Sequence, residues 1–238
     1  MHIVLIGAQG SGKGTQAQLL TQALRIEHVA SGDLFRKAFD ERTSLGIQAR
    51  AYIDRGELVP DNLTVAMVLQ RVEELRQRQG VLLDGFPRTV AQAQVLDTEF
   101  QRSGRQIDIA AYLAVPRTQL LTRLSGRYLC RAEQHIYHQV TRPPKVAGIC
   151  DLDGSELYQR SDDVGEAVQK RLDIFFHETI RLIDYYRERG KLVEVNGNQS
   201  VEQVQKELQK ALRSHSKKTA RATVASMRRA YEAIAFTG

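Results

Sequence analysis

The run His2-Ile3-Val4-Leu5-Ile6 leads directly into Gly7-Ala8-Gln9-Gly10-Ser11-Gly12-Lys13-Gly14-Thr15 near the start of the chain. The first five residues form a short apolar run, which is typical of a buried strand in a parallel sheet. The following glycines let the backbone wrap around phosphate oxygens and direct successive N–H groups inward. A helix is expected to open in this loop, so its N-terminus adds partial positive charge to that of Lys13. The stretch therefore predicts a phosphate-binding loop between a strand and a helix.

The hydroxyl of Thr15 in this loop can bind the Mg²⁺ that accompanies a nucleoside triphosphate. One departure from the general pattern is that Gly14 separates Lys13 from the hydroxyl residue. The alternative is a glycine-rich strand-to-helix turn with a surface lysine, which the strand context and the matching loop positions disfavour. We therefore predict nucleotide contacts from Gly10, Ser11, Gly12, Lys13, Gly14 and Thr15.

Three further apolar runs, at 81–84, 109–113 and 192–195, have the composition of buried strands. Strands that alternate with helices predict an α/β fold, with a parallel sheet at the core and helices flanking it. The helical patterns lie at residues 16–24, 63–79, 89–100, 117–124 and 163–188.

Two stretches interrupt this alternation. Residues 31–60 have the pattern of short helices, and residues 127–160 have the prolines, glycines and polar alternation of a small β unit. Loops of such length inside a compact domain are usually functional, often as lids. We expect the following organisation: a core at 1–29, 61–126 and 161–212, a helical insert at 30–60, a β lid at 127–160, and a basic C-terminal helical extension at 213–238.

Composition limits the classes of function. The chain has 238 residues, 42% of them hydrophobic, and no apolar run of about 18 residues, so we expect no membrane span. The N-terminus lacks the features of a signal peptide, and two cysteines suit a reducing compartment, so a cytoplasmic protein is expected. Residues 213–238 hold six Lys or Arg and one acidic residue, which accounts for five of the six net positive charges. The nearly neutral remainder gives no reason to expect nucleic acid on the body of the protein.

The GKGT form of the loop, the motif Ser31-Gly32-Asp33 and the motif Asp84-Gly85-Phe86-Pro87-Arg88-Thr89 together resemble the adenylate kinase family. The resemblance covers about residues 1–212, and the DGFPRT motif is far more specific than a phosphate loop alone. It implies a core, an insert that binds nucleoside monophosphate, and a lid. The implied activity is reversible phosphoryl transfer from Mg-ATP to AMP, giving two ADP. The implied cofactor is Mg²⁺, the partners are ATP, AMP and ADP, and we expect a working monomer.

Arginines fit the chemistry that this resemblance implies. The nucleophile is a phosphate oxygen that is already anionic, so the reaction needs cations and exclusion of water rather than a general base. Guanidinium groups suit bidentate phosphate contacts. One arginine alone is as well explained as a solvated surface residue. Six lie at the family's positions: Arg36, Arg88, Arg123, Arg127, Arg160 and Arg171.

The resemblance also implies roles for single residues. Asp84 can orient Mg²⁺ through water, and Asp33 is either a helper there or a helix N-cap. Asp162 and Asp163 either anchor lid arginines or are purely structural. The expected catalytic residues are Lys13, Arg88, Arg123, Arg160, Arg171 and Asp84. Besides the loop, the expected ATP contacts are Arg123, Arg127, Ile136, Tyr137 and Gln199. The expected AMP contacts are Ser31, Arg36, Glu57, Leu58, Val59, Gly85, Phe86, Pro87, Arg88, Gln92, Arg160 and Arg171.

Ser31 and Gln92 occupy positions that bind the acceptor base in the family. Many relatives have Thr where this chain has Ser31, so the hydroxyl is kept and one methyl group is lost. Gln92 can present both a hydrogen-bond donor and an acceptor to the edge of adenine. Recognition of AMP is therefore expected to persist.

Both cysteines of the chain, Cys130 and Cys150, fall in the predicted lid. Lids of the family that bind metal carry two short ligand pairs, and Cys150 with Asp153 retains the second pair. His135 follows Cys130 closely, so Cys130, His135, Cys150 and Asp153 offer a ligand set that Zn²⁺ accepts, with Glu133 as an alternative fourth ligand. The other interpretations are a lid without metal, held by hydrogen bonds, and a Cys130–Cys150 disulfide.

Rival functions differ in what they require. A GTP:AMP phosphotransferase would keep the same motifs, whereas UMP/CMP kinases usually have a short lid. A regulatory nucleotide-binding module would keep the loop but would not need the six arginines or DGFPRT.

The tail has an apolar stripe at helical spacing: Ala220, Val224, Met227, Tyr231 and Ile234. An extra helix docked on the core is the favoured interpretation. A docking element for an acidic partner, a membrane surface or nucleic acid is the alternative.

Overall fold

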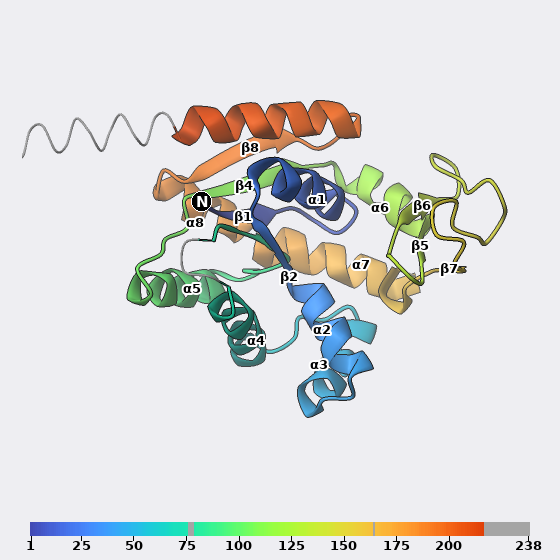
Figure 1. Ribbon diagram of the computed structural model, residues 1–238, viewed down its shortest axis with the longest axis horizontal. Helices are drawn as coiled ribbons and strands as arrows, with labels where there is room; N and C mark the ends of the chain where they lie inside the picture. Colours follow the sequence, from blue (N-terminus) through green and yellow to red (C-terminus); the bar gives the residue numbers. More distant parts are fainter. Residues whose placement is uncertain (76–78, 164, 217–238) are drawn as a thin grey trace, which may run out of the picture.

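The computed structural model describes residues 1–75, 79–163 and 165–216 (Figure 1). A parallel sheet with the strand order β2-β3-β1-β4-β8 lies at its centre. The predicted α/β class with a parallel core is therefore confirmed. The strands are β1 (His2–Ile6), β2 (Glu27–Ala30), β3 (Val81–Asp84), β4 (Ile109–Ala114) and β8 (Leu192–Asn196).

Helices cover both faces of this sheet, because successive strand residues point to opposite sides. Ile3 and Leu5 pack with α1 and with the helix at 201–216, whereas Val4 and Ile6 pack with the helices on the other face. Each side of the central strand β1 is thus buried. The helices of the core are α1 (Lys13–Leu24), α4 (Asp61–Glu73), α5 (Val90–Arg102), α6 (Arg117–Ser125), α7 (Gly165–Ile174) and α8 (Arg181–Glu188).

The two predicted inserts project from the core on separate sides (Figure 1). The first consists of α2 (Ser31–Asp40) and α3 (Ser44–Asp54), which pack with each other over a small cluster that includes Phe35. The second is an antiparallel sheet with the order β6-β5-β7. Its strands are β5 (Arg127–Cys130), β6 (Ile136–His138) and β7 (Leu157–Tyr158). The expected helical insert and small β lid are both present.

Three elements differ from the sequence-based expectation. Strand β2 has no counterpart among the predicted strands, because two of its four residues, Glu27 and His28, are polar. The helix predicted at 63–79 ends at Glu73. The helix predicted at 163–188 is divided into η1 (Ser161–Asp163), α7, a π-helical turn η2 (Phe175–Thr179) and α8. An apolar periodicity does not register the extra residue that a π turn inserts.

The helix at 201–216 closes one face of the core through Val204, Leu208 and Leu212, which are each at most 4% exposed. The apolar stripe predicted between Ala220 and Ile234 lies outside the described residues. Within the described ranges, none of the helices has the length and apolar character needed to cross a membrane.

Candidate active site

The loop between β1 and α1 has the backbone shape that its glycines predict. Gly10 and Gly12 have φ angles of 81° and 92°, in the left-handed region that favours glycine. A Cβ atom on Gly7 would lie 2.5 Å from Ser11 Oγ, so a side chain there would force the loop open. The chain then enters α1 at Lys13, and the first N–H groups of that helix face the loop without partners inside the helix.

Lys13 lies under this loop and is half-buried. Its ammonium donates hydrogen bonds to the carbonyl oxygens of Gly7, at 2.7 Å, and Ala8, at 3.0 Å. Burial, together with the nearby guanidinium groups of Arg88 and Arg171, lowers the pKa of Lys13 to about 8 against the opposing effect of Asp84. The site therefore holds Lys13 in an environment that disfavours its charge until an anion arrives.

Asp84 ends β3 beside the loop, because the sheet register pairs it with Leu5 of β1. His28 Nε2, on the neighbouring strand β2, lies 3.6 Å from Asp84 Oδ2. Burial opposes the ionisation of Asp84, but His28 and Lys13 outweigh it and hold the pKa of Asp84 below its ordinary value. An ionised carboxylate at this position is the kind of oxygen ligand that Mg²⁺ prefers.

The turn after β3 brings two predicted acceptor-side residues to one carbonyl. Ser31 Oγ and Arg88 Nε both donate to the oxygen of Gly85, each at 2.8 Å. Gly85 has a φ of 75°, and a Cβ atom there would lie 2.9 Å from Ser31 Oγ. Burial lowers the pKa of Arg88 to about 10, and Arg171 lowers it further.

Arg127 and Arg171 meet at a carboxylate whose side chain is fully buried. Asp163 accepts from Arg127 at 2.8 and 2.6 Å and from Arg171 at 2.9 Å. Asp162 adds a second ion pair to Arg171, at 3.0 Å. Both aspartates therefore hold these arginines, as one of the two sequence-based interpretations stated.

Arg160 approaches the same place from the end of the lid. Its Nε is buried and has no hydrogen-bond partner among the described residues. Burial lowers the pKa of Arg160, and the guanidinium groups of Arg36 and Arg127 lower it further. Arg36 itself pairs with Asp33 one helical turn earlier. We call the following residues the phosphate-site cations: Lys13, Arg36, Arg88, Arg127, Arg160 and Arg171.

Arg123 lies on the other side of the loop. Its guanidinium donates to the carbonyl of Gly10, at 3.4 Å, and to the carbonyl of Gly197, at 3.2 Å. It thus joins the phosphate loop to the turn after β8. Gln199 lies in that turn, where its side chain donates to Asn196 O at 3.0 Å. Burial lowers the pKa of Arg123.

Several predicted contacts have side chains that are occupied elsewhere. Glu57 pairs with Arg55 at 2.8 Å and with Lys170 at 2.7 Å, and these hydrogen bonds lower the pKa of Glu57 to about 2. Tyr137 is 2% exposed and lies in the lid core, where its hydroxyl meets Cys150 Sγ at 3.4 Å. Buried side chains also belong to Val59, Phe86 and Pro87, while those of Leu58 and Ile136 are half-buried. Such residues shape the site through packing and backbone more than through free polar atoms.

Gln92 is held by a hydrogen-bond network at the start of α5. Its Nε2 donates to Asp61 Oδ1 at 2.6 Å, and its Oε1 accepts from the backbone N–H of Arg88 at 2.7 Å. Thr89 Oγ1 donates to the other oxygen of Asp61 at 3.0 Å. Gln92 is 1% exposed, so this amide is fixed by its neighbours rather than by water.

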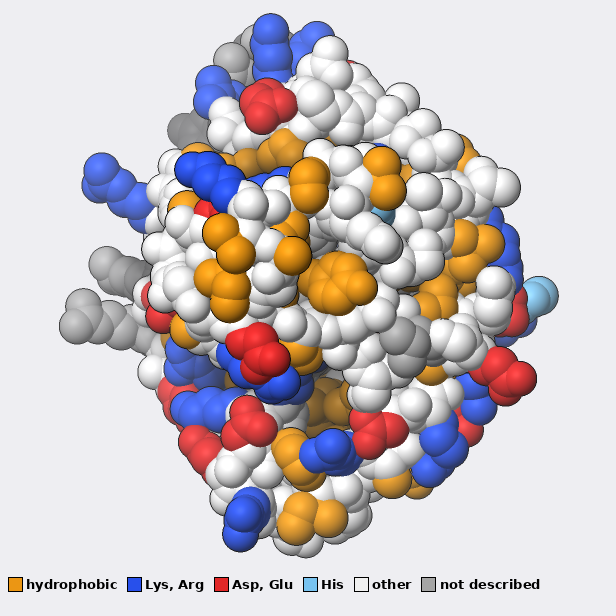
Figure 2. Space-filling model, turned by 90° about the vertical axis from the view of Figure 1, so that its right-hand side faces the viewer, with side chains coloured by type: hydrophobic (Ala, Val, Ile, Leu, Met, Phe, Trp, Pro, Cys, Tyr) orange, Lys and Arg blue, Asp and Glu red, His pale blue; other side chains and the backbone are white. Residues whose placement is uncertain are grey.

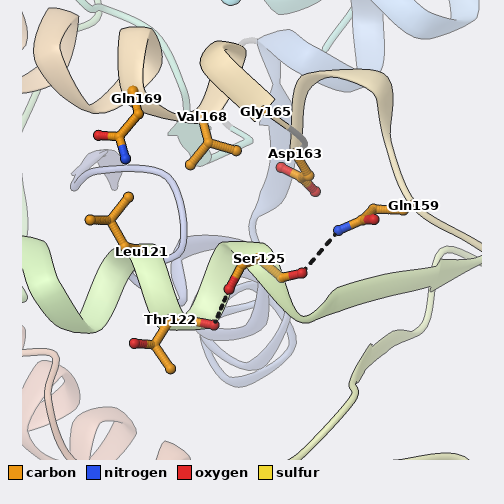
Figure 3. Close-up of a pocket in the computed structure, with 8 residues that line it drawn as sticks. All are labelled: Leu121, Thr122, Ser125, Gln159, Asp163, Gly165, Val168 and Gln169. Carbon is orange, nitrogen blue, oxygen red and sulfur yellow. Dashed lines mark hydrogen bonds between the residues drawn. The ribbon is translucent and has the colours of Figure 1, made fainter.

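A cleft of about 520 Å³ lies at the base of the lid, between α6 and α7 (Figure 3). Gln159, where the lid returns to the core, donates to the carbonyl of Ser125, at the end of α6, at 3.1 Å. Asp163 lines this cleft and also binds Arg127. The cleft therefore marks the junction about which the lid joins the core, and it is not lined by the phosphate loop.

The four predicted metal ligands of the lid come together. Cys130 Sγ lies 3.4 Å from His135 Nδ1 and 3.1 Å from Asp153 Oδ2, and Cys150 Sγ lies 3.4 Å from His135 Nδ1. The ligand atoms of all four lie within 4.8 Å of one another, and Glu133 is not in this group. We call Cys130, His135, Cys150 and Asp153 the lid donor cluster. Both cysteines are free thiols, so the structure has no Cys130–Cys150 disulfide.

The lid donor cluster has its own electrostatic pattern. Burial raises the pKa of Cys130, and its contact with Asp153 raises it further. Burial also opposes ionisation of Cys150, but Tyr137 and backbone donors outweigh it and lower the pKa of that thiol. Hydrogen bonds from Ser155 and Cys130 hold the pKa of Asp153 well below its ordinary value, and contact with Cys150 raises that of His135.

The lid side of the molecule shows charges of both signs (Figure 2). Lys and Arg side chains alternate with Asp and Glu over the lower half of this face, so opposite charges offset one another there. Hydrophobic side chains are spread over the upper half, and four exposed hydrophobic residues belong to the lid: Val140, Val146, Ile149 and Leu152. This face is therefore not a continuous basic surface of the kind that binds nucleic acid.

A family model described as adenylate kinase matches residues 5–191, which includes the phosphate loop, both inserts and every phosphate-site cation. The chain belongs to the adenylate kinase family. The adenylate kinase of Bacillus velezensis is 45% identical over 217 residues, which cover 91% of this chain and 100% of that protein. That of Listeria monocytogenes serotype 4a is 45% identical over 214 residues, covering 90% and 100%. That of Bacillus subtilis is 46% identical over 204 residues, covering 86% and 94%.

Three residues of this adenylate kinase family site were not found from the sequence. His28 lies in the strand that the pattern missed, and Asp61 lies 31 residues before Gln92, with which it pairs. Asn198 contacts Arg123 at 3.4 Å across a gap of 75 residues in the chain. Each is an ordinary polar residue in its local context, so only the folded arrangement assigns it to the site. The only sequence signal for these residues was the expectation that elements distant in the chain come together at one edge of the sheet.

Proposed function

We propose that this chain transfers a phosphoryl group reversibly from Mg-ATP to AMP, giving two ADP. The observation that carries the proposal is the convergence of the phosphate-site cations on the phosphate loop. Burial and mutual repulsion lower the pKa values of Lys13, Arg88 and Arg160, and these groups gain most from an anionic ligand. Relatives that carry the name adenylate kinase, at about 45% identity over most of the chain, support the same activity.

The residues suit a transfer between two phosphates. The attacking oxygen of AMP is already anionic, so the chain needs no general base, and the cations offset the charge that spreads over the oxygens in flight. Lys13 and Arg123 serve the donor side of the loop, whereas Arg36 and Arg88 serve the acceptor side. Closure of the lid would bring Arg160 nearer and exclude the water that otherwise leads to hydrolysis.

Mg²⁺ fits the loop edge because Asp84 is held ionised there and the Thr15 hydroxyl lies at the start of α1. These two residues would hold the ion, Asp84 through water and Thr15 directly. When bound with ATP, the ion supplies charge neutralisation for the phosphates. Lys13 and the arginines orient the nucleotide oxygens around it.

The site roles within this activity are proposals of the same kind. On the donor side they assign the loop residues 10–15 together with Arg123, Arg127, Ile136, Tyr137 and Gln199. On the acceptor side they assign Ser31, Arg36, Gln92 and the residues of the 85–88 turn. The bonds of Ser31 and Arg88 to Gly85 support the second group, because both side chains donate to the same carbonyl oxygen.

A GTP:AMP phosphotransferase and a non-catalytic regulatory module are not favoured. The relatives named above are enzymes by name, and the chain retains all six arginines that a module would not require. A coupled assay of ADP formation tests the proposal across ATP, GTP, CTP and UTP with AMP, UMP and CMP. We expect the highest kcat/KM for ATP with AMP, and absence of turnover with that pair contradicts the proposal.

We also propose that the lid donor cluster binds Zn²⁺. Tetrahedral Zn²⁺ with bonds of about 2.0–2.3 Å places its ligand atoms roughly 3.3–3.8 Å apart. Contacts of 3.0–3.4 Å between the donors of Cys130, His135 and Asp153 and between those of Cys150 and His135 lie at or slightly below this spacing, so small shifts would admit the ion. Two sulfurs, one nitrogen and one oxygen are a donor set that zinc accepts. The ion would fasten the two halves of the lid, since its ligands come from both.

Elemental analysis of the purified protein tests this second proposal. We expect about one equivalent of zinc, and much less in Cys150→Ser, while Glu133→Gln, a matched change outside the cluster, keeps its metal. A content below roughly a tenth of an equivalent of zinc or iron in the wild type contradicts it. Thiol counting on the same sample separates a lid without metal, which has two free thiols, from one closed by a disulfide.

We also propose that the protein is a monomer and that it is located in the cytoplasm. The residues proposed for both substrates come from one chain, and two free cysteines suit a reducing compartment. We further propose that residues 30–60 and 127–160 move as separate units against the core. Sedimentation at assay concentration tests the first point, and hydrogen exchange with and without nucleotide tests the second.

A further inference from the structure

The start of α4 and the start of α5 are joined by a closed set of hydrogen bonds around Gln92. Asp61, the first residue of α4, accepts from Gln92 Nε2 at 2.6 Å and from Thr89 Oγ1 at 3.0 Å, using one oxygen for each. Thr89 caps α5 by accepting from the backbone N–H of Gln92 at 3.1 Å. Gln92 Oε1 accepts from the backbone N–H of Arg88 at 2.7 Å.

This network fixes which way the side-chain amide of Gln92 points. A carboxylate such as that of Asp61 has only acceptors, and a backbone N–H such as that of Arg88 can only donate. The amide nitrogen must therefore face Asp61 and the amide oxygen must face Arg88. The reverse orientation would set the NH₂ group against an N–H and the oxygen against a carboxylate, and both bonds would be lost. Burial of Gln92 to 1% exposure means that water would not replace them.

Each end of the amide keeps capacity for one more hydrogen bond. Nε2 has a second hydrogen, and Oε1 has a second lone pair. Gln92 thus offers one donor and one acceptor whose positions cannot be exchanged. Arg88, whose backbone holds the oxygen of Gln92, also lines the proposed acceptor pocket through its side-chain bond to Gly85.

The fixed orientation of the Gln92 amide determines which base of the acceptor nucleotide it can pair with. Adenine presents a 6-amino donor next to its N1 acceptor, whereas a 6-oxopurine presents an acceptor next to an N1–H donor. A glutamine that could rotate its amide would accept either pattern, but a fixed one matches a single pattern. We propose that Asp61 is a positioning residue that, through Gln92, makes the acceptor site select a 6-aminopurine monophosphate over a 6-oxopurine monophosphate. This inference rests on the proposed function, in which Gln92 binds the acceptor base.

Asp61→Asn is the appropriate variant because it keeps the size of the side chain while adding a donor. The new amide can pair with Gln92 in either orientation, so only the Arg88 N–H still opposes rotation. Loss of one of two such buried restraints is worth on the order of tenfold. Asp108→Asn is the matched control, since this carboxylate also accepts a hydrogen bond, here from the backbone N–H of His2 at 2.7 Å, on an unrelated part of the sheet.

The experiment measures kcat/KM with ATP for AMP and for inosine monophosphate, in the wild type and the variants. We expect the ratio of the two values to fall on the order of tenfold in Asp61→Asn, with Asp108→Asn unchanged. Gln92→Ala should lose discrimination, and Asp61→Asn added to it should change the ratio no further. Asp61→Ser, whose hydroxyl both donates and accepts, provides a second variant if the first unfolds below assay temperature.

Equal losses for both nucleotides in Asp61→Asn would show a purely structural role and overturn the inference. A further change of the ratio in the Gln92→Ala background would overturn it as well, because Asp61 would then act by another route. A wild type that forms no ADP from ATP and AMP rejects the proposed function itself. That outcome is distinct from a wild type that uses AMP but whose ratio is insensitive to Asp61.

Discussion

The phosphate-site cations and the lid donor cluster each gather groups of one chemical kind, cations in the first and metal-ligand atoms in the second. Around Lys13 the excess is positive, and the pKa values of Lys13 and Arg88 fall to about 8 and about 10. In the lid, the ligand atoms of two thiols, an imidazole and a carboxylate lie within 4.8 Å of one another. The first arrangement favours an anion and the second favours a cation.

The two regions also differ in how they are assembled. The lid donor cluster comes from 24 consecutive residues, from Cys130 to Asp153, so its pattern is legible in the sequence. The phosphate-site cations extend from Lys13 to Arg171, and the parallel sheet must form before they meet. Damage to Lys13 or Arg88, which hold no buried carboxylate, should therefore affect chemistry while leaving the fold intact, and damage to the lid donor cluster should affect stability first.

The largest effect is expected from Lys13→Met. The substitution removes a charge that we propose acts on the transferring phosphoryl group, and lost electrostatic stabilisation of this kind costs about 10²–10³ in rate. The melting temperature should not fall, because burial already disfavours the charged form of Lys13. Steady-state kinetics with ATP and AMP measures the loss. Lys206→Met, on the exposed side of the helix at 201–216, is the control, and wild-type turnover in Lys13→Met would contradict the assignment.

Local patterns were enough to predict most of the fold but less of the site. The apolar runs of β1, β3 and β4 lie inside the sheet and are mostly buried, and β8, at one edge, keeps an apolar run at Leu192 and Val193, so their composition marks them as strands. Strand β2 pairs on one side only, and an edge strand tolerates Glu27 and His28, which hid it. Asp61 escaped notice for a different reason, since its partner Gln92 is 31 residues away and no local rule connects them. Sequence reasoning found the residues that carry charge, and Asp162 and Asp163 that hold two of them, but it missed His28 and Asp61.

Arg88→Ala should have the second largest effect. The guanidinium that binds Gly85 O is also the proposed contact of the AMP phosphate, and a lost charged hydrogen bond costs about 1.5–3 kcal/mol, or roughly 10- to 150-fold in kcat/KM. We expect a higher KM for AMP together with a lower kcat, while the KM for ATP changes little. Arg102→Ala, which removes an exposed arginine paired with Glu99 on α5, is the control. A purely ATP-side defect in Arg88→Ala would refute the acceptor assignment.

The lowered pKa of Lys13 predicts a pH dependence. Above pH 8 the free enzyme loses the Lys13 charge, so kcat/KM for ATP should fall by up to about tenfold per pH unit. Bound phosphate restores the charge, and kcat should therefore stay level to higher pH. The nucleotide phosphates are already ionised in this range.

Because the unfolded lysine titrates near 10.5 and keeps its proton longer, the Lys13 contribution to the free energy of unfolding rises between pH 8 and 10.5. Parallel pH profiles for kcat and kcat/KM would contradict this assignment.

Removal of metal should distinguish the two regions most directly, because it should lower the melting temperature and leave kcat nearly unchanged. A chelator is expected to lower the melting temperature by roughly 5–10 °C, since a ligand at 100 times its Kd adds about 2.7 kcal/mol and each kcal/mol shifts a chain of this size by about 2–4 °C. At assay temperature, kcat should change less than twofold, because no phosphate-site cation belongs to the lid donor cluster. Zinc added back should restore the melting temperature of the wild type but not of Cys150→Ser. A chelator without effect on melting would show that the lid donor cluster is held by hydrogen bonds alone.

The smallest effect is expected from deletion of residues 217–238, which lie outside both regions. Every phosphate-site cation and every member of the lid donor cluster precedes this segment, and the helix at 201–216 keeps its buried Val204, Leu208 and Leu212. Hence kcat and metal content should both remain within twofold of the full chain. If the tail packs on the core as its apolar stripe predicts, the melting temperature should fall by a few degrees, because a small buried helix contributes about 1 kcal/mol or more. Loss of salt-sensitive binding to anionic vesicles or nucleic acid, with melting unchanged, would instead favour a docking role. If the truncated chain folds but has no turnover, part of the catalytic machinery must lie outside both the phosphate-site cations and the lid donor cluster. The comparison of these two regions would then be incomplete.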